Sequence, residues 1–435
     1  MLLRAIFKNF LSFDSETEFN MFPNHRKKTL MNHVYNINDS VSVLKMAALY
    51  GGNGAGKSNF IKGIDFVSKF VKSPAYVNKE NVGQYFFALK ADCGKDPMEL
   101  TIEFTNKDNN AFIYTVSIGT EGIVHEGLYS SGLGLAETKP IFMREARSLT
   151  YPTIESEGVR PIVDSWMRKN AFVSFFHINN DMEVMNIADL DAAREWIVSD
   201  LAILDLKTIN PELIYLFRKS AQLNEFTSTM FRAIGLGIGD VKVVTENFDE
   251  WVMRNGSQDV PIEKLDGENR GISQITDWRN TAELYIEDGI KKISQFVFDQ
   301  YGKNGFSREM DIMSQSDGTV RLLTLAPALY RASVLGDTVA VDEIDNKIHP
   351  HLLRNLVRYF SQKETKGQLI FTTHQTCLLS QQIIRTDEVL FAEKTDGATQ
   401  MYSLNDFQEH STINIENGYL DGRYGAIPFI GELTM

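Results

Sequence analysis

Apolar segments that end in glycine-rich or polar turns predict buried strands at both ends of the chain. Residues 2–7 form one such segment, and residues 46–50 form another that runs directly into glycines. A helix is expected to begin near Lys57, immediately after those glycines. Toward the other end, residues 339–341 and 368–373 have the continuous apolar character of strands that are buried on both faces. This alternation of strands and helices predicts one α/β domain assembled from two distant segments of the chain.

Further elements follow from shorter patterns within these two segments. Residues 100–104 and 112–118 alternate between apolar and polar side chains, which is typical of antiparallel strands, and the turn-forming residues 106–110 lie between them. Helices are expected after Gly318 and from His351.

The hydrophobic pattern changes to helical spacing in the middle of the chain, from about Pro152. Residues 189–206 carry apolar side chains three or four positions apart, and residues 210–212, Asn-Pro-Glu, have the composition of a helix start. Another helix is predicted near residues 224–234. We therefore expect an N-terminal α/β segment at 1–150, a mainly helical insertion at 151–294 and a C-terminal α/β segment at 295–435.

Composition places the chain among ordinary globular proteins. It has 435 residues, of which 43% are hydrophobic and 23% charged. No apolar run approaches the roughly 18 residues of a membrane span, and the first residues lack the features of a signal peptide. The two cysteines are too few for a disulfide framework or a cysteine zinc site. We expect a cytoplasmic protein with no membrane partner.

The net charge argues against a protein that lives on duplex DNA. The balance of 44 basic and 57 acidic residues gives −13, whereas phosphate neutralisation normally requires a basic surface. The one dense basic run, residues 25–28, is expected to be a solvated loop rather than a phosphate contact.

Residues 51–58, Gly-Gly-Asn-Gly-Ala-Gly-Lys-Ser, fit the P-loop pattern. The glycines allow backbone N–H groups to surround phosphates, while Lys57 reaches the β and γ oxygens of a nucleotide. Ser58 supplies a hydroxyl group to Mg²⁺. A strand before the loop and a helix after it are the context that this motif requires. The predicted ATP-binding residues here are Gly51, Asn53, Gly54, Gly56, Lys57, Ser58 and Asn59.

A second nucleotide motif is expected where the apolar strand 339–341 ends in two acids. Asp342 would hold Mg²⁺ together with Ser58, and Glu343 would orient and deprotonate the attacking water. An apolar strand followed by two acids is common, so its significance depends on the P-loop.

Two further features are typical of ABC-type ATPases. Ser316 and Gly318 are spaced as in the Ser-x-Gly signature, which offers a hydroxyl, an amide and a helix N-terminus to the γ-phosphate of another subunit. A simple helix-capping turn is an alternative, and both interpretations can hold together. His374 follows a buried strand, where a switch histidine contacts the γ-phosphate, although a lone histidine is more often structural. Gln84 is a candidate for the glutamine that contacts Mg²⁺ in these proteins.

Two other patterns are not nucleotide motifs. Residues 235–239, Gly-Leu-Gly-Ile-Gly, follow a predicted helix and precede a strand, which is the reverse of a dinucleotide-binding loop, so we interpret them as a helix C-cap and a turn. Residues 106–109 lack the final aspartate of a guanine-recognition motif, so GTP specificity has no support.

The four motifs together resemble the soluble ABC ATPases grouped with RecF, the SMC proteins and the overcoming-lysogenization-defect family. The likeness is greatest to the anti-phage branch, which includes the ATPase subunits of Septu, PARIS and abortive-infection systems. The motifs that carry it are residues 9–13 (Asn-Phe-Leu-Ser-Phe), the P-loop, residues 316–319, residues 342–350 and residues 422–428 (Gly-Arg-Tyr-Gly-Ala-Ile-Pro).

The resemblance implies a homodimer or higher homo-oligomer with ATP and Mg²⁺ between two chains. Lys57, Ser58, Asp342, Glu343 and His374 would act from one chain, while Ser316 and Gly318 would act from the other. It further implies a regulatory subunit that responds to a phage-protein trigger and controls a separate nuclease or toxin. Too few residues follow His374 for a fused nuclease domain, and residues 152–294 lack the heptads of SMC arms.

Two other functions stay open at this point. A DNA repair or end-binding ATPase would show strong stimulation of turnover by DNA and salt-dependent affinity. A kinase that uses the P-loop would transfer phosphate to an acceptor other than water, but it would not need the signature or the switch histidine.

Overall fold

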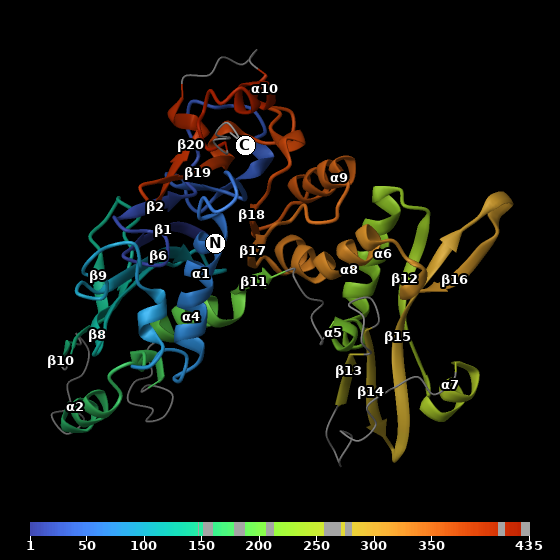
Figure 1. Ribbon diagram of the computed structural model, residues 1–435, viewed down its shortest axis with the longest axis horizontal. Coiled ribbons are helices and arrows are strands. Elements are labelled where there is room, and N and C mark those ends of the chain that lie inside the picture. Colours follow the sequence, from blue (N-terminus) through green and yellow to red (C-terminus); the bar gives the residue numbers. More distant parts are fainter. Residues whose placement is uncertain are drawn as a thin grey trace, which may run out of the picture. The chain divides into compact units, whose positions relative to one another are not determined.

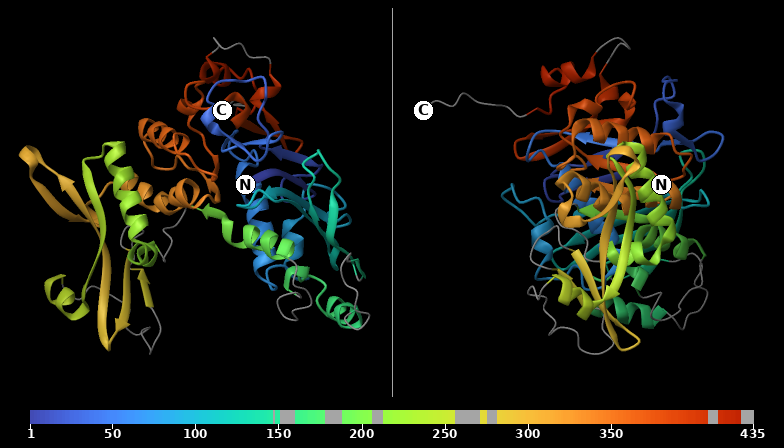
Figure 2. Two further views of the ribbon diagram at one scale, coloured as in Figure 1. Left: turned by 180° about the vertical axis from the view of Figure 1, so that it is seen from behind. Right: turned by 90° about the vertical axis from the view of Figure 1, so that its right-hand side faces the viewer.

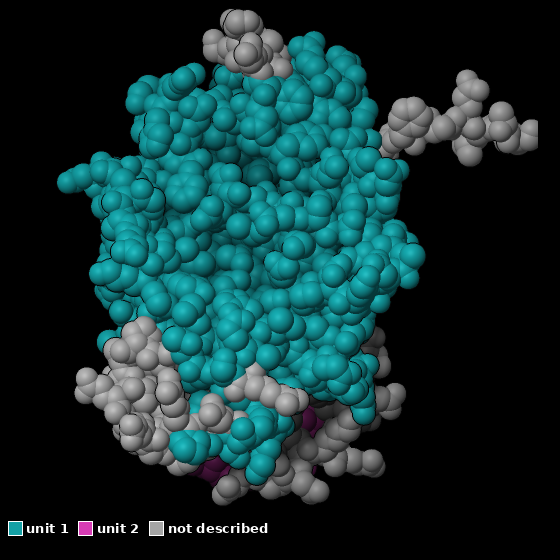
Figure 3. Space-filling model, turned by 90° about the vertical axis from the view of Figure 1, so that its left-hand side faces the viewer, with its two compact units in different colours: residues 1–204, 331–343, 358–435 teal, residues 205–330, 344–357 magenta. Residues whose placement is uncertain are grey.

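The computed structural model describes residues 1–146, 148–150, 160–177, 188–205, 213–255, 271–274, 281–407 and 414–427. The chain divides into two compact units, coloured separately in Figure 3. Unit 1 comprises Met1–Leu204, Arg331–Glu343 and Arg358–Met435, and unit 2 comprises Asp205–Tyr330 and Ile344–Val357. The predicted segment boundaries at 150/151 and 294/295 therefore differ from the boundaries of these units.

A largely parallel sheet forms the centre of unit 1, with strand order β11-β17-β18-β5-β19-β20. The P-loop strand β5 (Met46–Tyr50) pairs in parallel with β18 (Gln368–Thr372) on one side and β19 (Val389–Thr395) on the other. Every residue of β5, β18 and β17 (Thr338–Asp342) is buried, as the continuous apolar runs predict. The prediction of an α/β domain built from both ends of the chain is confirmed.

An antiparallel sheet forms the second layer of unit 1, in the order β10-β9-β8-β7-β6-β1-β2 (Figure 1). Helix α1 (Lys57–Lys72) packs against this sheet through Phe60, whose ring lies 5.9 Å from that of Phe7 and 4.4 Å from that of Phe19. Gly63 is required at the same contact, because a Cβ there would lie 2.6 Å from the Phe7 ring. The strands are β1 (Leu2–Lys8), β2 (Thr17–Asn20), β6 (Met98–Thr105), β7 (Ala111–Gly119), β8 (Gly122–Ser130), β9 (Lys139–Glu145) and β10 (Ser148–Thr150).

Unit 2 contains an antiparallel sheet as well as helices (Figure 2). Strand β15 (Ile290–Tyr301) lies between β12 and β14 and also pairs with β16, and Phe296 and Phe298 on alternate positions are buried. The stretch 151–294, which was expected to be mainly helical, thus contains both helices and strands. Alternating apolar positions typical of strands follow the helical spacing along the chain. The other strands are β12 (Ile238–Asn247), β13 (Gly271–Gln274), β14 (Thr281–Glu287) and β16 (Ser307–Asp311), and the helices are α5 (Leu213–Lys219), α6 (Ala221–Ile234), α7 (Phe248–Asn255) and α8 (Asp317–Tyr330).

The helix predicted over residues 189–206 is wrong from Leu201 onward. Helix α4 covers Ala188–Glu195, a π-helix continues over Trp196–Asp200, and strand β11 (Leu201–Asp205) then joins the edge of the parallel sheet beside β17. Sheet pairing overrides the local helical spacing here. Residues 152, 206, 210–212 and 428 lie outside the described residues.

The remaining elements complete the two units. Gly235 ends α6 with φ 78°, so the interpretation as a helix C-cap and turn is confirmed for residues 235–237, and strand β12 begins at Ile238. The elements are β3 (Val34–Asn36), β4 (Ser42–Leu44), β20 (Ala398–Ser403), α2 (Arg160–Lys169), α9 (Pro350–Ser361) and α10 (Ile415–Leu420).

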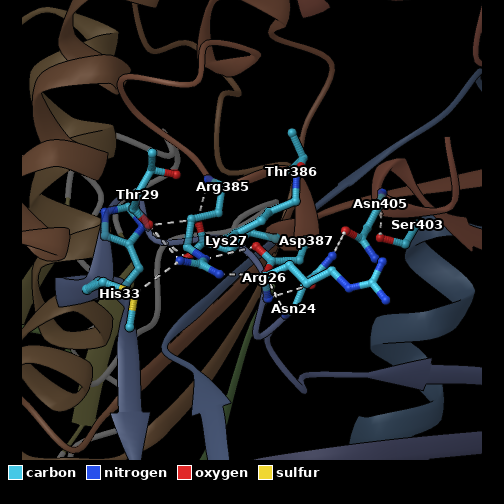
Figure 4. A network of polar contacts seen from close by, with 12 residues as sticks. Asn24, Arg26, Lys27, Thr29, His33, Arg385, Thr386, Asp387, Ser403 and Asn405 are labelled. Atoms are coloured by element: carbon cyan, nitrogen blue, oxygen red, sulfur yellow. Dashed lines mark hydrogen bonds and ion pairs between the residues drawn. The ribbon is translucent and has the colours of Figure 1, made fainter. Parts of the chain in front are cut away.

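The basic run at residues 25–28 is largely solvent-exposed, as predicted, and only Lys27 makes a partly buried contact. Lys27 is half-buried and its amino group contacts the hydroxyl of Thr386 (Figure 4). Burial lowers the pKa of Lys27. The run is thus tied to the C-terminal segment of unit 1. Among the described residues, no helix combines the length and apolar character needed to cross a membrane.

Candidate nucleotide-binding site

The backbone between β5 and α1 adopts conformations that favour glycine. Gly51 has φ 154°, and a Cβ there would lie 2.3 Å from the carbonyl oxygen of Ala392. Gly56 has φ 108°, and a Cβ there would lie 2.1 Å from the hydroxyl oxygen of Thr399. Both glycines therefore permit a close approach that another residue would block.

Lys57 begins α1 and is buried. Its amino group donates hydrogen bonds to the carbonyl oxygens of Gly51 at 2.8 Å and Gly52 at 3.1 Å, so the charge is held within the loop. The positive end of the helix dipole adds to this charge, and together they suit an anion.

The side chains of Ser58, in the P-loop motif, and Asp342, in the acidic motif, are in contact. The Ser58 hydroxyl donates to Asp342 Oδ1 at 3.1 Å, although 284 residues separate them in the chain. A hydroxyl and a carboxylate are hard oxygen ligands of the kind that Mg²⁺ takes beside nucleotide phosphates. The donor set fits a magnesium ion that these two side chains would hold.

Thr372, at the end of β18, connects the two acids of the second motif. Its hydroxyl donates to Asp342 Oδ1 at 2.7 Å, and it accepts the backbone N–H of Glu343 at 2.7 Å. Glu343 has φ 50°, an uncommon conformation for a non-glycine residue that the surrounding structure must stabilise. The strand end thus fixes the backbone from which the Glu343 carboxylate extends.

A hollow of about 350 Å³ lies over the loop. It is lined by residues 53–59, Glu343 and His374, so one cavity brings together the P-loop, the predicted base and the predicted switch histidine. His374 is exposed, and the residue after it is fixed because the Tyr50 hydroxyl donates to the Gln375 carbonyl oxygen at 3.1 Å.

The signature residues Ser316 and Gly318 belong to unit 2, at the start of α8. The Ser316 hydroxyl accepts the backbone N–H of Thr319 at 3.2 Å, so the capping alternative is present in the structure. Ser316 itself is exposed. A Cβ at Gly318 would lie 3.1 Å from the carbonyl oxygen of Lys347, which favours glycine there.

A protein family described as "AAA domain, putative AbiEii toxin, Type IV TA system" matches residues 46–158 and 262–380, which is more than half of the chain. The chain belongs to this family. The two matched stretches contain the P-loop of the AAA domain, its acidic motif, its signature and His374. The protein therefore carries a P-loop AAA domain.

One solved structure of an SMC head shares the fold of this AAA-family chain. The SMC head bound to the C-terminal winged-helix domain of ScpA is 12% identical, with a TM-score of 0.50 over 92% of this chain and 97% of that one. The heads from Pyrococcus furiosus (11% identical, TM-score 0.48, 97% and 98% covered) and Thermotoga maritima (11% identical, TM-score 0.43, 92% and 98% covered) also match. A comparison with curated proteins finds no match.

Some site features of the AAA domain escaped the sequence analysis. Thr372, two positions before His374, was not predicted; the only sequence signal for it was a hydroxyl residue at the end of a buried strand.

Gln84 is exposed in a 3-10 helix, Val82–Tyr85, and the residues that line the hollow do not include it. Its role as a magnesium contact stays a prediction.

Proposed function

We propose that the protein binds Mg²⁺–ATP at the P-loop of unit 1 and hydrolyses it in a site that a second copy completes. The observation that supports the proposal most strongly is the hydrogen-bonded arrangement of Ser58, Asp342, Thr372 and the Glu343 backbone, in which a hydroxyl–carboxylate pair suited to Mg²⁺ lies next to a second acid. Phosphoryl transfer to water needs this combination of charge neutralisation and a positioned base.

Each side chain has one task in this mechanism. Lys57 and the loop amides hold the β- and γ-phosphates, while Ser58 and Asp342 hold Mg²⁺ directly or through water. Glu343 orients and deprotonates the attacking water. His374 contacts the γ-phosphate from the edge of the hollow. The other predicted nucleotide contacts are Gly51, Asn53, Gly54, Gly56 and Asn59.

A second copy supplies Ser316 and Gly318 to the γ-phosphate. ATP then favours the closed homodimer, because its terminal phosphate contacts both chains, and hydrolysis removes those contacts. The exposure of Ser316 supports this assignment, because a residue that serves another subunit must be accessible to it.

In the cell, we propose a regulatory ATPase of an anti-phage system that controls a separate nuclease or toxin and responds to a phage protein. The family description, which names a toxin of a type IV toxin–antitoxin system, supports a role in abortive infection. The net charge of −13 supports a protein partner over duplex DNA.

The substitution Glu343→Gln tests the mechanism. It keeps the size of the side chain but removes the base, so ATP turnover should fall by about 10²–10³ while ATP binding persists. Light scattering on a sizing column should then detect dimers in ATP. Lys57→Ala is the control and should lose both binding and dimers. Normal turnover in Glu343→Gln would disprove the mechanism.

A second measurement concerns the alternative function. ATP turnover of the wild type that rises strongly when DNA is added would instead support a DNA-end ATPase.

A further inference from the structure

Three polar side chains from distant parts of unit 1 meet beside the P-loop. Ser12 comes from the loop between β1 and β2, Asn59 from the first turn of α1, and Thr399 from β20. Ser12 is 7% exposed and Thr399 is 1% exposed, so these hydroxyl groups rely on partners within the protein.

These groups form a continuous chain of hydrogen bonds that ends on the P-loop. The Asn59 amide donates to the Ser12 hydroxyl at 2.9 Å, and the hydroxyls of Ser12 and Thr399 lie 2.7 Å apart. The Thr399 hydroxyl donates to the Ala55 carbonyl oxygen at 2.9 Å. Thr399 is the donor in both contacts, so its one hydroxyl proton is shared between Ser12 Oγ and the Ala55 carbonyl oxygen.

The last bond sets the direction of a peptide group in the loop. The peptide unit between Ala55 and Gly56 is planar and trans, so its C=O and N–H point in opposite directions. With the carbonyl held by Thr399, the Gly56 N–H points away from Thr399. Gly56 also lines the hollow, and its φ of 108° together with the adjacent Thr399 side chain leaves this peptide little freedom.

We infer that Ser12, Asn59 and Thr399 act as positioning residues that hold the P-loop in its phosphate-binding conformation, an inference that rests on the proposed ATP site. The chain of bonds gives a role to the segment at residues 9–13, which contains Ser12. The Asn59 amide nitrogen donates to Ser12, while Asn59 also lines the hollow over the loop. β20 thereby acts on ATP binding through the loop without touching the ligand.

The substitution Thr399→Val removes the hydroxyl while keeping the branched shape, and Thr399→Ser keeps the hydroxyl. Thr395→Val is the matched control, because Thr395 is exposed at the end of β19 in the same hairpin. In nucleotide-free protein, amide hydrogen exchange of residues 51–60 should accelerate in Thr399→Val and Ser12→Ala. Thr399→Ser and Thr395→Val should match the wild type. Thermal unfolding identifies any variant that fails to fold, and if Thr399→Val fails, Ser12→Ala carries the comparison.

The affinity for Mg²⁺–ATP gives the functional result. Thr399→Val should bind about tenfold more weakly, since it leaves the Ala55 carbonyl and the Ser12 hydroxyl without their partner, and Thr399→Ser should restore binding. Combining Thr399→Val with Ser12→Ala should weaken binding by less than the product of the two effects. Unchanged exchange, or changed exchange with unchanged affinity, would overturn the inference. If the wild type binds no ATP, the proposed function is overturned. Faster exchange in Thr399→Val would in that case still support the hydrogen-bonded chain.

Discussion

At the scale of single residues, Thr372 shows how a side chain without reactive chemistry can set up a site. It is fully buried, and its one hydroxyl contacts both the Asp342 carboxylate and the Glu343 backbone. Because Glu343 holds a φ of 50°, it needs such support to keep its carboxylate in place.

If the proposed mechanism holds, replacing Thr372 with valine should lower kcat for ATP hydrolysis by about tenfold or more, because the proposed base and metal ligand would lose their orientation. ATP affinity should change less, since the P-loop contacts are intact. Steady-state kinetics and a binding titration separate the two effects. Thr372→Ser is the control and should retain most of the turnover; a kcat in Thr372→Val equal to that of the wild type would contradict this role.

The sequence alone predicts the residues whose chemistry is visible in a motif. Lys57, Ser58 and Asp342 belong to patterns whose spacing follows from phosphate and metal binding. Ser12 and Thr399 could not be predicted, because 387 positions separate them and no local pattern links a hydroxyl in one turn to a hydroxyl in a distant strand.

At the scale of elements, a polar network ties residues 24–33 to the 3-10 helix Thr386–Glu388 (Figure 4). The buried Arg385 guanidinium makes two bonds to the Asp387 carboxylate, at 2.7 Å and 2.9 Å, and a third to the Thr29 carbonyl oxygen at 2.6 Å. His33 lies 3.0 Å from Glu388, whose pKa is raised by burial. The network joins the segment before β5 to the one before β19.

Arg385→Ala should lower the free energy of unfolding by about 3–5 kcal/mol, because it leaves a buried carboxylate without its cation. Lys79→Ala is the comparison: Lys79 and Glu121 form an ion pair with exposed side chains, and its loss should cost less than about 1 kcal/mol. Urea denaturation of both variants measures the difference. Equal destabilisation would show that the buried network contributes no more than a surface pair.

The sequence predicts a strand well where both of its faces are buried. It predicts an element poorly where pairing with a distant strand determines the conformation. The strands at 46–50 and 368–372 follow from continuous apolar runs. The strand at 201–205 was expected to be helical, since its conformation depends on β17, which is distant in the sequence.

At the scale of the whole molecule, mixing two variants tests whether two copies share one site. Lys57→Ala disables the P-loop of its own chain, and Ser316→Arg disables the signature offered to a partner. Each variant alone should be inactive. An equal mixture should recover a substantial part of the wild-type rate, because each mixed dimer contains one intact composite site that can close on ATP. ATP turnover of the mixture is the measurement, and a mixture as inactive as its components would exclude a shared site.

The pairing of β5 with β18 and β19 has a consequence for how the protein is made. The register joins Met46 to Leu369 and Ala48 to Val389, so the strand that leads into the P-loop finds its neighbours more than 300 residues later. On a ribosome that strand emerges more than 300 residues before its partners and stays unpaired until they have been synthesised. Closing so large a loop makes folding slow, and the apolar strand is exposed to aggregation throughout that interval.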